Sequence, residues 1–130
     1  MSNELIVAYW VKASDVDYYA MDDLFKNSHY IWALFVGHLV IEKLLKAYLV
    51  KSGSTRIPYI HDLTKIAEKA NLGLSEEQKD FLDEVTTFNI KARYPDYKNR
   101  FYKKASREFT EHYIIEIKRF RQWLIEKINN

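Results

Sequence analysis

The sequence contains no cysteine, and only three glycines and two prolines among its 130 residues. The absence of cysteine excludes a disulfide-bonded scaffold, thiol catalysis and zinc held by thiolates. So few glycines and prolines argue against a turn-rich all-β fold. The longest stretch without a charged residue, residues 27–41, is shorter than the roughly 20 residues that span a bilayer. Because the N-terminus also lacks the features of a signal peptide, we expect a cytoplasmic protein with no membrane partner.

The composition is that of a chain with a substantial core, since 48% of the residues are hydrophobic and 15% are aromatic. The length predicts a single domain over residues 1–130. The net charge of +2 does not by itself indicate a nucleic-acid partner. The positive charge is concentrated, however, in residues 91–107, where seven basic residues accompany the single acid Asp96. We expect an anionic ligand to be drawn to this basic segment.

Apolar residues recur at steps of three and four along most of the chain, which indicates amphipathic helices. The pattern predicts five helices, over residues 4–26, 29–52, 62–70, 75–94 and 100–128. Asn27 and Ser28 predict a break with a helix cap, and Gly53 predicts the end of the second helix. Asp62 is the predicted cap of the third helix. Ser75 and Gln78 fit a capping box, and Pro95 disfavours helix at the residue before it. The expected fold class is all-α, an up-and-down four-helix bundle with one extra short helix.

The second predicted helix carries a strip of polar residues on an otherwise apolar sequence. The strip consists of His38, Glu42, Lys43 and Lys46. On a helical wheel these four residues fall within an arc of about 140°. One interpretation is a solvated edge in which Glu42 and Lys46 form an i,i+4 ion pair. The other is a polar strip that faces the basic segment and lines a shared cleft. The sequence leaves both open.

The basic segment interleaves cations with aromatic rings, a combination that suits phosphate contacts and base stacking. The candidate residues for binding a nucleotide or RNA are Lys43, Lys46, Arg93, Tyr94, Asp96, Lys98 and Arg100. In this hypothesis Arg93 clamps a phosphate and Tyr94 stacks. The structural alternative is that Tyr94 and Phe101 pack into the bundle and that Arg93 neutralises Asp96 or Glu42.

Other site chemistries find little support in the sequence. The four histidines, at positions 29, 38, 61 and 112, do not form the His-x3-His spacing of a helical metal site. The chain also lacks a glycine-rich phosphate loop and a serine in a nucleophile-elbow context. We therefore expect no metal and no cofactor.

Three sequence blocks carry a family resemblance. They are Glu42-Lys-Leu-Leu-Lys-Ala47, His61-Asp-Leu63 and Ala92-Arg-Tyr-Pro-Asp96, and in this order they resemble the HEPN domain family (higher eukaryote and prokaryote nucleotide-binding). The resemblance covers nearly the whole chain and implies an up-and-down four-helix bundle that forms a homodimer. It also implies a minimal nucleotidyltransferase as partner, in some members within a toxin–antitoxin pair.

Family members that are metal-independent ribonucleases use an Arg-x4–6-His motif near the end of the fourth helix. Arg93 occupies the corresponding region, but no histidine stands at positions 98–100. The Arg-x4-His spacing is also present at Arg107 and His112, but both lie inside a predicted helix, where their side chains point about 140° apart. The match of Arg56 with His61 falls in a loop and has no precedent in the family. Without the expected proton-transfer group, the sequence predicts a non-catalytic protein.

Three functional hypotheses follow. The first is a non-catalytic HEPN protein that binds a nucleotide, RNA or a nucleotidyltransferase through the basic segment. A partner of this kind could modify Tyr94 or Tyr97. The alternative is a divergent metal-independent ribonuclease that uses Arg93 with His61 or His38. The third is an oligomerisation module whose exposed rings are Tyr18, Tyr19 and Trp123.

Overall fold

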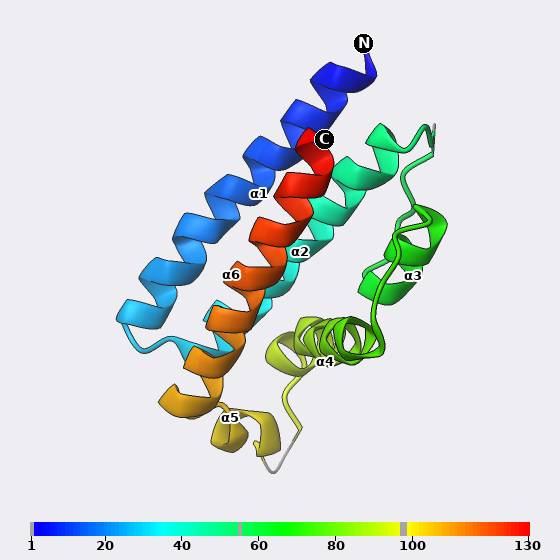
Figure 1. The fold of residues 1–130 in the computed structure, drawn as a ribbon. Coiled ribbons are helices and arrows are strands. Elements are labelled where there is room, and N and C mark those ends of the chain that lie inside the picture. Colours follow the sequence, from blue (N-terminus) through cyan, green and yellow to red (C-terminus); the bar gives the residue numbers. More distant parts are fainter. Residues whose placement is uncertain (1, 55, 97–98) are drawn as a thin grey trace.

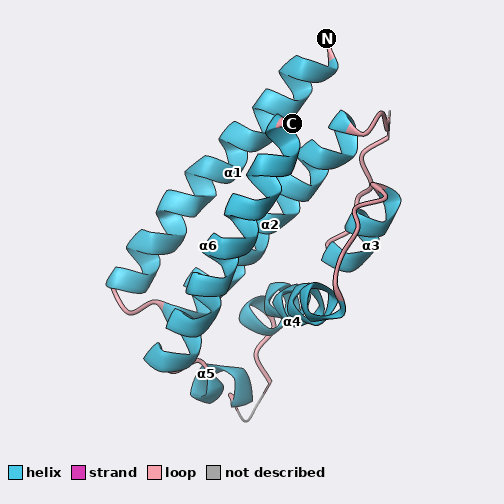
Figure 2. Cartoon of the chain, viewed as in Figure 1, coloured by secondary structure: helices cyan, strands magenta, loops and turns pink. Residues whose placement is uncertain are grey.

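The computed structural model describes residues 2–54, 56–96 and 99–130, and in these residues the chain forms six α-helices (Figure 1). They are α1 (Asn3–Lys26), α2 (Tyr30–Lys51), α3 (Leu63–Lys69), α4 (Glu76–Arg93), α5 (Arg100–Lys104) and α6 (Arg107–Asn129). The described part of the chain contains no strand (Figure 2), which confirms the all-α prediction. Among the same residues, no helix is long and apolar enough to cross a membrane.

The second helix, α2, lies at the centre of the core. More than half of its 22 residues are buried, because it is apolar on nearly every side. It contacts α1, α3, α4 and α6. Figure 1 shows α1, α2 and α6 side by side, whereas α4 is seen nearly end-on and so lies across them. The two chain ends lie at the same end of the molecule, and α5 lies at the opposite end.

Side-chain hydrogen bonds cap four of the six described helices, and the caps at Asp62 and Ser75 are those that the sequence predicts. The Asp62 carboxylate accepts a hydrogen bond from the Lys65 backbone N–H at the start of α3. Ser75 and Gln78 form the full capping box of α4, and that helix ends at Arg93, just before Tyr94 and Pro95. These contacts satisfy backbone donors that have no partner inside the helix.

The predicted helix over residues 100–128 is wrong in one respect, since it is divided into α5 and α6. Ala105 leaves the helical conformation, and the Ser106 hydroxyl accepts a hydrogen bond from the Phe109 backbone N–H to begin α6. The apolar spacing of Phe101, Ala105 and Phe109 continues across the break, so periodicity alone does not reveal it. The bundle therefore has two short helices, α3 and α5, where the sequence predicted one.

The break before α2 is confirmed, but the predicted cap is wrong. Ser28 adopts a left-handed conformation with φ +64°, and His29 stands at the cap position without a side-chain hydrogen bond. Further along α2, Gly37 permits the close approach of α6. A Cβ atom added at Gly37 would lie 2.6 Å from Ile117 Cδ1 and 3.2 Å from Met21 Sδ, so a larger residue does not fit without displacement.

Candidate functional site

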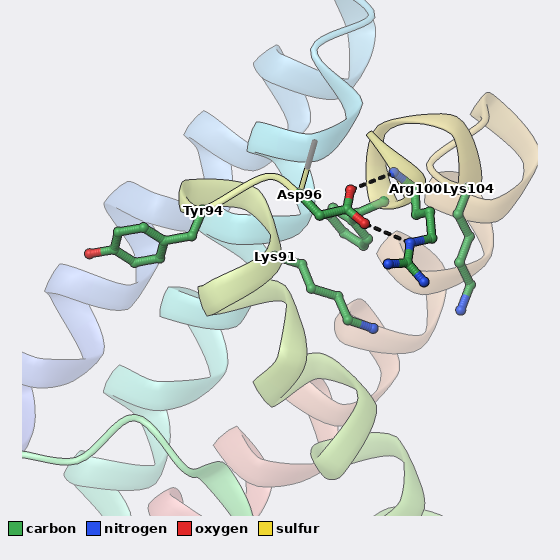
Figure 3. Close-up of a pocket in the computed structure, with 6 residues that line it drawn as sticks. Lys91, Tyr94, Asp96, Arg100 and Lys104 are labelled. Carbon is green, nitrogen blue, oxygen red and sulfur yellow. Dashed lines mark hydrogen bonds and ion pairs between the residues drawn. The ribbon is translucent and has the colours of Figure 1, made fainter. Parts of the chain in front are cut away.

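The basic segment runs from the last turn of α4 through α5 to the first residue of α6. Its side chains border a surface pocket of about 320 Å³, which we name the α4–α5 pocket (Figure 3). Among the described residues, the lining consists of Lys91, Tyr94, Asp96, Arg100, Phe101 and Lys104. Three cations and one carboxylate give this lining a net charge of +2. The pocket is therefore suited to an anion.

Asp96 fixes the start of α5 at the edge of this pocket. Its carboxylate accepts hydrogen bonds from the Arg100 backbone N–H at 2.9 Å and from Arg100 Nε at 2.6 Å, drawn as dashed lines in Figure 3. The backbone bond first, and then the side-chain bond, lower the pKa of the Asp96 carboxyl. Because the guanidinium uses Nε for this pair, its two terminal amino groups can still contact an anion in a bidentate manner.

Two lysines complete the positive side of the α4–α5 pocket. Figure 3 shows the side chains of Lys91 from α4 and of Lys104 and Arg100 from α5 directed into the same region. Lys91 Nζ lies 5.9 Å from the centre of the Phe101 ring, which is only 9% exposed. Lys104 Nζ lies 3.8 Å from a Glu84 carboxylate oxygen, at the limit of an ion pair. This exposed pair is weak, so the charge of Lys104 remains accessible to a ligand.

Arg93 and Tyr94 do not join these cations in the way that the binding hypothesis supposes. Figure 3 shows the Tyr94 side chain pointing away from Lys91 and Arg100, and 65% of Tyr94 is exposed. Arg93 does not line the pocket. Its Nε donates to the Asn89 backbone oxygen at 3.0 Å, and its guanidinium lies over the rings of Phe35 and Tyr94.

The structural alternative for these residues is correct in one part only. Phe101 packs into the core, but Tyr94 does not. Asp96 pairs with Arg100 instead of Arg93. Of the remaining candidates, Lys98 and Tyr97 lie outside the described residues.

Lys43 and Lys46 lie apart from the α4–α5 pocket, on the side of α2 that faces α1. Lys43 Nζ makes an ion pair with the Asp17 carboxylate at 2.6 Å. Lys46 Nζ pairs with Glu42 at 3.0 Å and lies 5.5 Å from the centre of the Trp10 ring. Both cations are neutralised within the chain, and neither belongs to the lining of the pocket.

The polar strip of α2 is a buried network, so the interpretation as a solvated edge is wrong. Glu42 is almost fully buried, and each of its carboxylate oxygens has a partner. One accepts a hydrogen bond from Lys46 Nζ at 3.0 Å, and the other accepts one from His61 Nδ1 at 2.7 Å. The predicted Glu42–Lys46 pair is present, but the strip faces the loop before α3 and Trp10 of α1.

His38 is the fully buried member of this network. Its Nε2 lies 2.9 Å from the backbone oxygen of His61, and since a carbonyl can only accept, the ring proton is on Nε2. Nδ1 is then an unprotonated acceptor, and it has no hydrogen-bond partner among the described residues. Burial is the main cause that lowers the pKa of His38, with the positive charge of Arg93 a minor one. His38 is therefore neutral at physiological pH, and its buried ring is not accessible to a ligand at the surface.

Sequence reasoning missed the contact between Glu42 and His61, which are 19 positions apart. The signal was present in the family resemblance, because Glu42 and His61 begin two of its three blocks. Periodicity could not connect them, since His61 lies in a loop. Over the same described part of the chain, no cluster of three histidine, aspartate or glutamate side chains could hold a metal ion.

Comparison with known proteins agrees with the helical fold. The family model of the HEPN domain matches residues 7–128, nearly the whole chain. No curated protein and no solved structure shows significant similarity to it.

Proposed function

The chain belongs to the HEPN domain family, and from this premise we propose that it is a non-catalytic member that binds the phosphate groups of a nucleotide or of RNA at the α4–α5 pocket. The observation that carries the proposal is the convergence of Lys91, Arg100 and Lys104 on one pocket (Figure 3). Phosphate is the biological anion that such a group of cations recognises best, through charge and through bidentate hydrogen bonds from arginine.

The electrostatics of the pocket support an accessible positive charge. Lys91 makes no ion pair with any described residue, and Lys104 has one distant, exposed partner. Arg100 is paired with Asp96, but exposed pairs of this kind contribute little and can rearrange around a ligand. Tyr94, a well-exposed member of the pocket lining, offers a ring face for a base at the rim of the pocket.

The state of His38 and the composition of the pocket support a binding role over catalysis. A general acid or base must reach the substrate within hydrogen-bond distance. His38 is buried and already donates its proton to a backbone carbonyl. The α4–α5 pocket itself contains no histidine among its described lining residues. The described lining therefore offers cations suited to phosphate, and none of its described members is a histidine that could transfer a proton at neutral pH.

The test is fluorescence anisotropy with labelled ten-nucleotide single-stranded RNA and, in parallel, labelled adenosine nucleotide, each titrated at several salt concentrations. Lys91→Ala and Lys104→Ala are each expected to weaken binding several-fold. For RNA, each lost phosphate contact lowers the slope of log Kd against log salt by about 0.7. Lys65→Ala, an exposed lysine on α3, is the matched control and leaves affinity unchanged.

Two results would contradict the proposal. One is the absence of binding to either probe at low salt. The other is binding that Lys91→Ala, Lys104→Ala and Lys65→Ala weaken equally, because this would indicate non-specific attraction to any lysine. A preference between the two probes identifies whether the ligand is a free nucleotide or RNA.

The family also supports a protein partner, a minimal nucleotidyltransferase with which this chain would form a toxin–antitoxin pair. Tyr94 is the residue we propose for modification by that enzyme, because it borders the α4–α5 pocket, is 65% exposed and directs its hydroxyl outward, away from the cations. Incubation of the two proteins with nucleotide, followed by intact-mass measurement, should add one nucleotidyl group to the wild type and none to Tyr94→Phe. Addition to Tyr94→Phe at the wild-type level refutes the assignment.

One observation favours a second candidate function, ribonuclease activity. The Glu42 carboxylate orients the His61 ring through a 2.7 Å hydrogen bond, and 55% of the His61 side chain is exposed. A carboxylate that orients an accessible histidine is the usual arrangement of a general base. If this function holds, purified protein cleaves RNA without metal and His61→Ala lowers the rate at least about 100-fold. Intact RNA, or equal cleavage by His61→Ala, excludes it.

A further inference from the structure

A second surface pocket lies between the first turns of α4 and the middle of α6, and phosphate binding at the α4–α5 pocket does not use it. Its volume is about 460 Å³, and we name it the α4–α6 pocket. The members of its described lining that bear on a ligand are Glu77, Phe81, Glu116, Arg119, Phe120 and Trp123. None of them lines the α4–α5 pocket, so a ligand here is independent of the proposed function.

Three aromatic rings form a continuous surface in the α4–α6 pocket. Phe120 is only 5% exposed, and its ring centre lies 5.6 Å from that of Phe81 and 5.3 Å from that of Trp123. The face of an aromatic ring attracts a cation, and tryptophan does so most strongly. Trp123 already holds one within the chain, since Lys127 Nζ lies 5.1 Å from its ring centre. Lys127 does not belong to the described lining, so its ammonium leaves the pocket open.

The position of Trp123 corrects one prediction made from the sequence, an exposed set of rings at Tyr18, Tyr19 and Trp123. Tyr19 is 66% exposed. Tyr18 is half-buried, with the Arg121 guanidinium 4.1 Å from its ring centre, and Trp123 is half-buried in the α4–α6 pocket. The three rings therefore do not form one exposed surface.

Two carboxylates, Glu77 on α4 and Glu116 on α6, come from the two helices that flank the rings. Glu77 is exposed and makes no ion pair with any residue that the structure describes. Glu116 pairs with Arg119 at 2.9 Å, but the Arg119 side chain is 73% exposed. Exposed pairs of this kind are weak, so a ligand can displace the guanidinium. Burial first, and then the negative charges of Glu84 and Glu116, raise the pKa of the neighbouring Tyr113.

The start of α4 is poorly suited to an anion, although helix starts commonly attract one. Ser75 Oγ accepts a hydrogen bond from the Gln78 backbone N–H at 3.1 Å, and Gln78 Oε1 accepts one from the Ser75 backbone N–H at 2.9 Å. Two backbone donors are therefore already used. The described lining, with two carboxylates and one guanidinium, carries a net charge of −1. This charge and the aromatic rings favour a cation.

We propose that the α4–α6 pocket binds an aliphatic diamine or polyamine. The methylene chain of the ligand lies on the rings of Phe81, Phe120 and Trp123. One ammonium group pairs with Glu77, and another replaces the Arg119 guanidinium at Glu116. A lysine side chain of a protein partner offers a single ammonium group, so the two carboxylates on opposite helices favour a ligand with a charge at each end of an apolar chain.

An NMR titration of the full chain with putrescine, an aliphatic diamine, tests the proposal. The indole N–H signal of Trp123, identified by its loss in Trp123→Phe, should shift and saturate in the wild type. Glu77→Gln and Glu116→Gln should each weaken putrescine binding about threefold, because each removes one partner of an ammonium group. Glu111→Gln on α6 changes an exposed glutamate outside the described lining, and this matched control should leave the affinity unchanged.

Replacement of Arg119 is expected to change the affinity in the opposite direction. Arg119→Gln removes the guanidinium that competes for Glu116, so it should tighten putrescine binding about threefold. Lys65→Gln on α3 removes one positive charge outside the described lining and is the control. Equal tightening by both variants would indicate attraction to the overall charge of the chain, and it would overturn the assignment of this site.

Uncharged and singly charged analogues test the diamine assignment. Butylamine has the same chain with one ammonium group and should bind about fivefold more weakly than putrescine, whereas uncharged butanediol should cause no saturable shift. Equal affinities for putrescine and butylamine refute the pairing of both carboxylates with one ligand. The proposal also fails if putrescine causes no saturable shift of Trp123. It fails as well if Glu77→Gln and Glu116→Gln, shown by circular dichroism to be folded, bind putrescine as the wild type does.

Discussion

Replacement of Glu42 by leucine removes the negative charge from the buried network and keeps a side chain of similar volume. Glu42 compensates the ammonium of Lys46 at 3.0 Å, and Lys46 is only 8% exposed. Leucine fills much of the space of glutamate, so the main effect of Glu42→Leu is to leave the Lys46 charge without a partner. His61 also loses its 2.7 Å hydrogen bond, but its exposed ring can bind water instead.

The expected cost follows from the burial of the pair. Removal of one partner of a buried ion pair typically costs about 3–5 kcal/mol. Because the flexible stem of Lys46 lets its ammonium move toward solvent, we expect the lower end, about 3 kcal/mol. An unfolding entropy of about 2.1 cal/mol/K per residue gives about 0.27 kcal/mol/K for this chain, so Tm should fall by about 11 °C.

Chemical denaturation of Glu42→Leu, Lys46→Leu and the double variant tests this reasoning. The double variant has no buried charge at either position and should lie within about 1 kcal/mol of the wild type. Glu116→Ala, which breaks the exposed Arg119–Glu116 pair, is the control and should cost less than about 1 kcal/mol. The reasoning is refuted if Glu42→Leu costs no more than the control, or if the double variant is as unstable as Glu42→Leu.

Three further predictions concern stability. Gly37→Val should lower the free energy of unfolding by about 2 kcal/mol or more, as measured by urea titration, because even the first added carbon lies 2.6 Å from Ile117 Cδ1. Ser106→Ala should lower the free energy of unfolding by about 1 kcal/mol in the same titration, since it removes the cap that begins α6. An unchanged free energy of unfolding would mean that other contacts cause the break between α5 and α6. Burial lowers the pKa of His38 in the folded state, so the unfolded chain binds the proton more readily. Stability should therefore be complete above about pH 6.5 and decrease as the pH falls from there through the lowered pKa, and His38→Leu should flatten this part of the Tm–pH curve.

The boundaries of most helices could be predicted from the sequence. The capping box at Ser75 and Gln78, the cap at Asp62 and the end of α2 before Gly53 were each predicted and are each confirmed. These features depend on hydrogen bonds between residues three or four positions apart, so nearby sequence is sufficient to specify them. The burial of α2 follows from another feature of its sequence, because a helix that is apolar on nearly every side has no face suited to solvent.

The environment of the polar residues was decided by the tertiary structure. The spacing of Glu42 and Lys46 predicts their ion pair, but only the packing of α1 and the loop before α3 against α2 buries it. Likewise, Lys91 and Lys104 share one pocket because the chain turns at Asn99, with φ +52°, and α5 ends before α6 begins. Hydrogen bonds within a helix need only neighbours along the chain, whereas desolvation and charge pairing depend on which distant segments come together in space.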